Sequence, residues 1–168
     1  MSFFKMLYKN IDRLIHLGGF ISGIFIVLIT GMIFYEVLSR AFFNSPTVFA
    51  TELSIYSLIG SCFIGSGYAL RTFSHITVDL VINIVSDKVK TILAILSNFL
   101  GLLFSVIFTW YGIHHVQGTY TLGVTSSSLL RVPMYLPEML LPIGGILLCF
   151  AFVLQIVDCF NKKGESQA

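Results

Sequence analysis

The sequence is poor in charged residues. It has 10 Lys and Arg and 8 Asp and Glu among 168 residues, so that 11% of the chain is charged while 56% is hydrophobic. An average soluble domain carries about 25% charged residues. This shortage excludes an ordinary soluble domain and places the chain in a lipid bilayer. The basic residues form no dense cluster, so we expect no nucleic acid among its partners.

Cysteine and histidine are scarce as well. The three cysteines form no CxxC pair, and a membrane thiol oxidase would need paired cysteines on the outer side. A haem would need two histidines at matching depth on facing helices. Only His16 and His75 could meet in this way, which leaves a small redox or haem-anchor subunit as the alternative function. We therefore expect no enzyme, no catalytic residue, no metal site and no cofactor.

Charge is absent from four stretches of the chain. These stretches run from Leu14 to Tyr35, from Leu53 to Leu70, from Thr91 onward, and from Met139 to Val157. A hydrocarbon core about 30 Å thick requires roughly 20 apolar residues of helix. The sequence therefore predicts an all-α integral membrane protein. It would form a single membrane domain over residues 1–168, with four transmembrane helices at about 14–38, 50–71, 90–113 and 135–158.

Lys and Arg are distributed unevenly between the two sides of these spans. One side holds the N-terminal tail, the second loop and the C-terminal tail, and the other side holds the first and third loops. The first set carries Lys5, Lys9, Arg13, Arg71, Lys88, Lys90, Lys162 and Lys163, and the second set carries Arg40 and Arg131. Because basic residues favour the cytoplasmic side, we expect both termini in the cytoplasm.

Two segments outside the spans are too apolar to extend freely into water. Over about residues 2–13, apolar residues recur at helical spacing, which favours an interfacial helix over a frayed terminus. Between Arg71 and Lys90 lies a second apolar stretch that is too short and too polar to span. We therefore expect an interfacial segment after the second span.

Small residues recur at a spacing of four in three of the spans. This spacing lines one face of each helix and lets helix backbones approach closely in lipid. The sequence therefore predicts helix-packing positions at Gly19, Gly23, Ser57, Ser61, Gly65, Ser97, Gly101 and Ser105.

Ionisable residues gather at the ends of the spans and leave the centres empty. Transporters usually place such residues near the midplane, so we expect no substrate-binding residue here. The spacing of Glu36 and Arg40 predicts an ion pair, and that of Arg71, His75 and Asp79 predicts a ladder on one helical face. The candidates for structural or partner contacts are Glu36, Arg40, Glu52, Arg71, His75, Asp79, Arg131 and Glu138.

Three stretches resemble a known family. The first runs from Arg40 through Phe42, Phe43 and Phe49 to Glu52, Leu53 and Tyr56. The second runs from Gly65 to Ala69 and then through Arg71, His75, Ile76, Val78 and Asp79. The third contains Pro133, Tyr135, Leu141, Pro142, Ile143 and Gly144. In this order they resemble the DctQ-like small membrane subunit of tripartite ATP-independent periplasmic (TRAP) transporters, although Phe49 and Tyr135 stand where the family commonly has Trp.

The resemblance implies a division of labour in the bacterial inner membrane. A soluble periplasmic solute-binding protein would capture an organic acid such as a C4-dicarboxylate or sialic acid. A large DctM-like membrane subunit would carry that acid across together with sodium. The small subunit would be a scaffold for the large one, surrounded by membrane lipids, and would contact the binding protein transiently.

Overall fold

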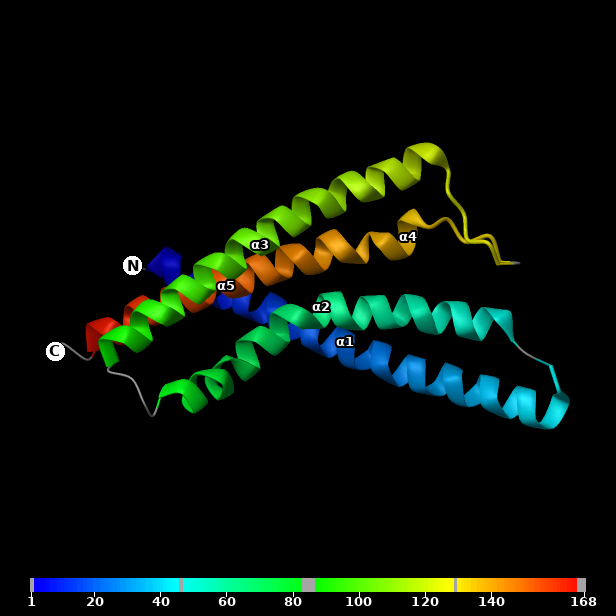
Figure 1. Cartoon of the computed structure of the whole chain (residues 1–168), viewed down its shortest axis with the longest axis horizontal. Helices are drawn as coiled ribbons and strands as arrows, with labels where there is room; N and C mark the ends of the chain where they lie inside the picture. The colour runs from blue at the N-terminus through cyan, green and yellow to red at the C-terminus, as the bar shows by residue number, and fades with distance from the viewer. Residues whose placement is uncertain (1, 46, 83–86, 129, 166–168) are drawn as a thin grey trace.

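The computed structural model describes the backbone over residues 2–45, 47–82, 87–128 and 130–165, and side chains over 5–45, 47–72, 89, 92–128 and 130–159 (Figure 1). Its helices are α1 (Ser2–Phe43), α2 (Val48–Ile82), α3 (Asp87–Leu122), α4 (Tyr135–Glu138) and α5 (Leu140–Glu165). The described residues form no strand beyond one isolated bridge. Four stretches are long and apolar enough to cross a bilayer, at Lys5–Phe43, Val48–Thr72, Ile92–Leu122 and Tyr135–Cys159. The prediction of four spans in an all-α protein is confirmed.

The helices end where the sequence supplies residues that suit a left-handed backbone. After α1, Asn44 has a φ of 48°, a conformation that asparagine tolerates better than most residues. After α3, Gly123 has a φ of 62°. Its amide donates to the carbonyl of Tyr120 at 3.2 Å, and the amide of Val124 donates to that of Thr119 at 3.2 Å. This is the Schellman arrangement, which satisfies the last carbonyls of a helix.

The long helices form a layer rather than a square bundle. α1 packs along α2, α2 packs on α5, and α5 packs on α3, while the described residues of α1 and α3 make no contact. Figure 1 shows the pairs α1/α2 and α3/α5 meeting toward the end that holds both termini and spreading toward the other end. Both termini, the C-terminal end of α2 and the N-terminal end of α3 therefore lie at one end of the molecule. This is the arrangement expected of a chain that crosses a membrane four times.

Only a small core is buried within the chain. Ile15, Ala151 and Leu154 are 1%, 0% and 2% exposed, and they lie where α1, α2 and α5 meet. By contrast, large apolar side chains along α1 and α3 are mostly exposed. In a protein surrounded by water this surface would be an aggregation hazard, whereas in a bilayer it faces lipid or another membrane protein.

Most of the predicted packing positions are contacts between helices. Ser57, Ser61 and Ser105 are buried. A Cβ added to Gly65 would collide with Ser22 of α1, and one added to Gly19 would collide with the ring of Tyr68.

Gly101 packs in the same way against the ring of Phe152 in α5. Two positions differ from the prediction, since Gly23 and Ser97 are exposed and Gly23 has no neighbour within 4 Å of an added Cβ. The neighbouring residues Ser22 and Asn98 do contact α2 and α5, so Gly23 and Ser97 lie on faces of α1 and α3 that these helices do not cover.

The two predicted interfacial segments are continuous with the spans. Residues 2–13 form the first turns of α1 with no break, whereas the sequence predicted a separate helix before the chain turns inward. Similarly, α2 continues to Ile82 past the expected end of its span. Helix-forming residues join these segments to the spans without Pro or a capping glycine, so nothing in the sequence ends the helix there. Their position at the membrane surface stays a prediction.

Candidate functional site at the two ends of the helix layer

Charged residues mark two levels of the layer that are one membrane thickness apart. On α2, Arg71 follows Glu52 by 19 residues, and no charged residue lies between them. At 1.5 Å per residue this separation is about 28 Å of helix, close to the thickness of a hydrocarbon core. Glu52 and Arg71 therefore belong to opposite membrane boundaries, and each is the centre of a polar cluster.

The cluster around Arg71 joins three helices. Its Nη1 donates to Oδ2 of Asp158 in α5 at 2.5 Å, and its Nη2 donates to Oδ1 of Asp12 in α1 at 2.9 Å. Tyr8 of α1 completes the arrangement, because its hydroxyl accepts from Nη2 at 2.9 Å and donates to Oδ1 of Asp158 at 2.8 Å. Only 16% of the Arg71 side chain is exposed. The planar guanidinium fork can hold all three groups at once, which an ammonium could not do with the same geometry.

Further contacts tie the same level together. The amide nitrogen of Gln155 in α5 donates to the carbonyl of Leu70 in α2 at 2.8 Å. His16 of α1 lies 3.8 Å from Oδ2 of Asp12 and packs edge-on against the ring of Tyr68 of α2. This end of the layer is therefore a joint between α1, α2 and α5.

The structure places Arg71 in a cluster with Tyr8, Asp12 and Asp158, three partners that the sequence did not predict. The predicted ladder from Arg71 to His75 and Asp79 stays a prediction, because the side chains of His75 and Asp79 lie outside the described ones. The sequence contained one signal for these partners, which was the position of Asp12. Asp12 is an acid among the basic residues of the N-terminal segment, where it would be unfavourable without a cation nearby.

The cluster around Glu52 holds the connection between α3 and α4. The Glu52 residue is only 8% exposed. Its Oε1 accepts from the hydroxyl of Tyr56, one turn later, at 2.5 Å, and its Oε2 accepts from the hydroxyl of Ser128 in that connection. Among the described residues, no basic group lies within ion-pair distance of this carboxylate. Hydroxyl donors take the place of a cation here.

The connection held by Glu52 is itself ordered. Thr125 and Pro133 form an antiparallel bridge, the amide of Ser126 donates to the carbonyl of Val132 at 2.8 Å, and that of Met134 donates to Val124 at 3.0 Å. We call residues 123–128 and 130–134 the outer hairpin, because the distribution of Lys and Arg predicts this loop on the outer side. Arg131 lies in it with a φ of 44° and an exposed side chain.

Two further side-chain pairs lie at the same end as Glu52. Arg40 donates to Oε1 of Glu36 at 2.6 Å, so the predicted pair is present, and Thr51 of α2 donates to Oε2 of Glu36 at 2.8 Å. His115 of α3 lies 3.5 Å from Oε1 of Glu138 in α4, while Oε2 of Glu138 is buried without a hydrogen-bond partner. Glu36 thus links α1 to α2 through Thr51, and His115 with Glu138 links α3 to α4.

The polar side chains of both clusters are paired with one another. The described side chains contain no group of three His, Cys, Asp or Glu residues that could hold a metal ion. The buried serines between the clusters donate to backbone carbonyls, for example Ser22 to Ser61 at 2.8 Å and Ser105 to Leu102 at 2.9 Å. Each cluster is instead a polar joint between helices.

Comparison with known proteins agrees with the resemblance seen in the sequence. Residues 29–162 match the family described as tripartite ATP-independent periplasmic transporters, DctQ component. A C4-dicarboxylate TRAP transporter small permease protein of Rhodobacter capsulatus is 32% identical over 118 residues, which are 70% of this chain and 51% of that protein. The chain thus spans about half the length of that relative.

A second relative matches over almost its whole length. A putative TRAP transporter small permease protein of Haemophilus influenzae is 23% identical over 163 residues, 96% of this chain and 94% of that protein. A C4-dicarboxylate TRAP transporter small permease protein of Vibrio cholerae is 23% identical over 155 residues, 80% of this chain and 67% of that protein. Together with the four spans, these matches indicate a multi-pass protein of the bacterial inner membrane. The chain belongs to the DctQ family, the small membrane components of TRAP transporters.

Proposed function

We propose that this chain is the non-transporting scaffold subunit of a sodium-coupled TRAP transporter that imports an organic acid. The acid would be a C4-dicarboxylate, sialic acid or a related carboxylate. The partners would be a large DctM-like membrane subunit, bound permanently, and a periplasmic solute-binding protein, bound transiently. The redox or haem-anchor alternative has no support from the comparisons.

The observation that carries this proposal is the depth at which polar groups occur. Charged side chains lie at the two boundary levels, and the hydroxyls between them are already paired with backbone carbonyls. A pathway for a carboxylate and sodium needs polar groups near the midplane or helices that are broken there. The described helices have neither a charged side chain nor a break between the two levels, which supports a structural role beside a transporting subunit.

The exposed aromatic residues of α3 support a permanent membrane partner. Phe99, Phe104 and Trp110 are 58%, 63% and 64% exposed, and they lie in the middle part of the helix. Side chains of this size pack well against another helix and are frequent in protein interfaces. We propose that the large subunit covers one face of the layer that includes α3.

The outer hairpin supports contact with the periplasmic protein. Glu52 and the backbone hydrogen bonds within the hairpin hold it in one shape, and Arg131 projects from it. A rigid loop loses less conformational entropy on binding than a flexible one, which suits a contact that must form and break quickly. This role requires the hairpin to face the periplasm.

Labelling of introduced cysteines tests that orientation. Ser127, in the outer hairpin, and Ser86, between α2 and α3, are each replaced by cysteine in a chain whose native Cys62, Cys149 and Cys159 are serine. In intact cells, a membrane-impermeant maleimide should label Ser127→Cys and leave Ser86→Cys unlabelled, because the basic residues lie on the side of Ser86. Labelling in the reverse pattern would invert the orientation.

Reconstitution tests the scaffold role. Proteoliposomes that hold this chain alone should take up no labelled organic acid, even with a sodium gradient and the periplasmic protein, because the chain has no midplane binding groups. With the large subunit added, uptake should depend on sodium and on the periplasmic protein. Uptake by this chain alone would contradict the scaffold role. Equal uptake by the large subunit with and without this chain would show that the scaffold is dispensable.

A further inference from the structure

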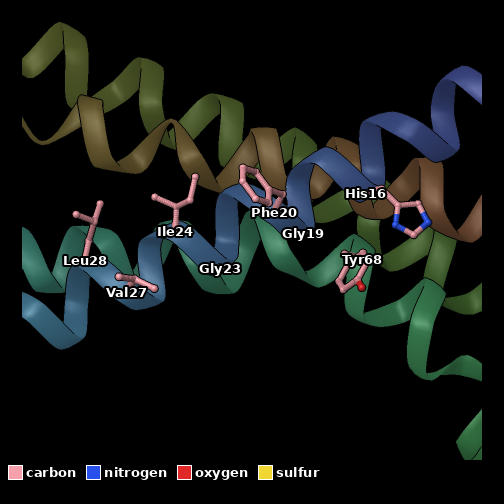
Figure 2. A pocket seen from close by; sticks show the side chains of 8 residues that line it. All are labelled: His16, Gly19, Phe20, Gly23, Ile24, Val27, Leu28 and Tyr68. Carbon is pink, nitrogen blue, oxygen red and sulfur yellow. The ribbon is translucent and has the colours of Figure 1, made fainter.

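A shallow apolar groove runs along α1. It is lined by residues of α1 from His16 to Leu28 and by Tyr68 of α2, and it has a volume of about 600 Å³. Figure 2 shows these side chains in order along the helix, with Tyr68 projecting from α2 beside His16. The groove exists because Gly19 and Gly23 have no side chain, so the surface of α1 is recessed at these two positions. Tyr68 fills the space above Gly19, and nothing lies within 4 Å of a Cβ built on Gly23.

One end of the groove carries positive charge. Lys9, Arg13 and His16 precede Phe20 at spacings of four, three and four, which places them on the same face of α1 as the groove. All three side chains are exposed. The acid of this segment, Asp12, is paired with Arg71 of α2 and lies 3.8 Å from His16 at the edge of that face, so Lys9 and Arg13 remain as its basic groups. The exposed face therefore presents basic groups at the membrane boundary and apolar side chains within the hydrocarbon.

The length of the groove matches one leaflet of a bilayer. From His16 to Leu28 the helix rises 12 residues, about 18 Å, which is slightly more than half of a hydrocarbon core about 30 Å thick. An acyl chain that begins at the boundary would run along this distance. A partner transmembrane helix would cross the whole bilayer and would leave Lys9 and Arg13 against its end without a defined counter-charge.

We infer that this groove binds one acidic phospholipid, with the phosphate at Lys9 and Arg13 and one acyl chain lying over Gly19 and Gly23. The lipid belongs to the leaflet at the Arg71 level, which is the leaflet where basic residues attract acidic headgroups. It covers the part of α1 that the chain leaves open, and it holds the first turns of α1 to the membrane surface. This inference does not depend on the transport role proposed above.

Native mass spectrometry of the purified chain in neutral detergent tests the site. The chain is titrated with phosphatidylglycerol and with phosphatidylcholine of identical acyl chains. One phosphatidylglycerol should bind at least fivefold more tightly than phosphatidylcholine. The double variant Lys9→Gln/Arg13→Gln should lose that preference, since one basic group near an acidic surface changes binding about fivefold.

Filling the groove should weaken both lipids. In Gly23→Phe the ring occupies the groove without meeting another part of the chain, so binding of both lipids should fall at least fivefold. Gly31→Phe is the matched control, because Gly31 also has nothing within 4 Å of an added Cβ and lies on α1 beyond the groove. Arg131→Gln is the charge control at the opposite boundary. Neither control should change binding.

Three results would overturn the inference. The first is equal affinity for the two lipids, and the second is binding that Gly23→Phe leaves unchanged. The third is a Gly23→Phe variant that keeps its lipid but no longer co-purifies with a larger membrane protein, which would assign the groove to that protein. The melting temperature is measured for each variant, and Gly23→Leu replaces Gly23→Phe if the latter unfolds.

Discussion

Arg71→Ala is expected to destabilise the detergent-solubilised chain by about 2–3 kcal/mol, because it removes the only described cation that Asp12 and Asp158 share and leaves both carboxylates together. The value lies below the roughly 3–5 kcal/mol typical of fully buried pairs, since the two aspartates are 30% and 36% exposed. The loss corresponds to a fall of roughly 4–12 °C in melting temperature. Thermal unfolding followed by circular dichroism measures it.

A double variant separates the ion pair from other effects of the substitution. Arg71→Ala/Asp158→Ala should lose less than the sum of its single variants, because removing the aspartate also removes the uncompensated charge. Arg40→Ala is the matched control. The Arg40 side chain is 65% exposed and its partner Glu36 lies four residues away on the same helix, so the loss should be about 0.3–0.5 kcal/mol. Additive losses, or an equal loss from Arg40→Ala, would contradict a joint centred on Arg71.

The spans and their number could be predicted because they depend on a local property. A helix that crosses a bilayer needs a continuous apolar stretch, and the positions of charged residues show where each stretch begins and ends. The ion pair of Glu36 and Arg40 was predictable for the same reason, since it depends on a spacing of four within one helix. The spans and this ion pair could thus be predicted because each depends on residues that lie within about one helix length of one another in the sequence.

The joint around Arg71 depends on contacts between distant segments. Its partners Asp12 and Asp158 lie 59 and 87 residues away along the chain, and no periodicity links such positions. The hydroxyl of Ser128, which binds Glu52, is 76 residues away. The sequence showed that these polar groups lie at the membrane boundaries, but only the packing order of the helices decides which of them meet.

The layered arrangement of the helices could not be predicted from the sequence either. In water, a helix shows its buried face by an amphipathic pattern, whereas in lipid both faces are apolar and the pattern is lost. The spacing of small residues indicates the buried face of a helix in lipid, but only in part. They located the contacts of Ser61, Gly65 and Gly101, but Gly23 and Ser97 fit the same spacing and are exposed. Gly144, which meets the backbone of its neighbour, was not part of any stripe with a spacing of four.

The interface between α2 and α5 holds the two helix pairs together. Gly144 of α5 is buried, and an added Cβ would lie 2.6 Å from the carbonyl carbon of Phe63 in α2. On the same interface, a Cβ on Gly67 of α2 would lie 3.0 Å from the carbonyl oxygen of Leu147. Two backbones therefore meet with no side chain between them. The neighbour of Gly144 is backbone, so it cannot turn aside as a flexible side chain would.

Gly144→Ala should therefore destabilise the chain by about 2–3 kcal/mol, near the upper part of the range for overpacked sites. The methyl group forces α2 and α5 apart, and the contacts between the pairs α1/α2 and α3/α5 weaken together. Unfolding by sodium dodecyl sulfate from mild detergent micelles, followed by near-ultraviolet circular dichroism of Trp110 and the tyrosines, measures the change. Gly144→Leu should prevent the two pairs from docking.

Gly31→Ala is the matched control for this substitution. Gly31 lies in the interior of α1 and has nothing within 4 Å of an added Cβ, so alanine meets no neighbour there. Because alanine favours the helix over glycine by up to about 1 kcal/mol, Gly31→Ala should be neutral or slightly stabilising. The opposite signs of the two substitutions would separate a steric clash from helix propensity. Equal stability of Gly144→Ala and Gly31→Ala would mean that α2 and α5 do not meet at Phe63 and Gly144.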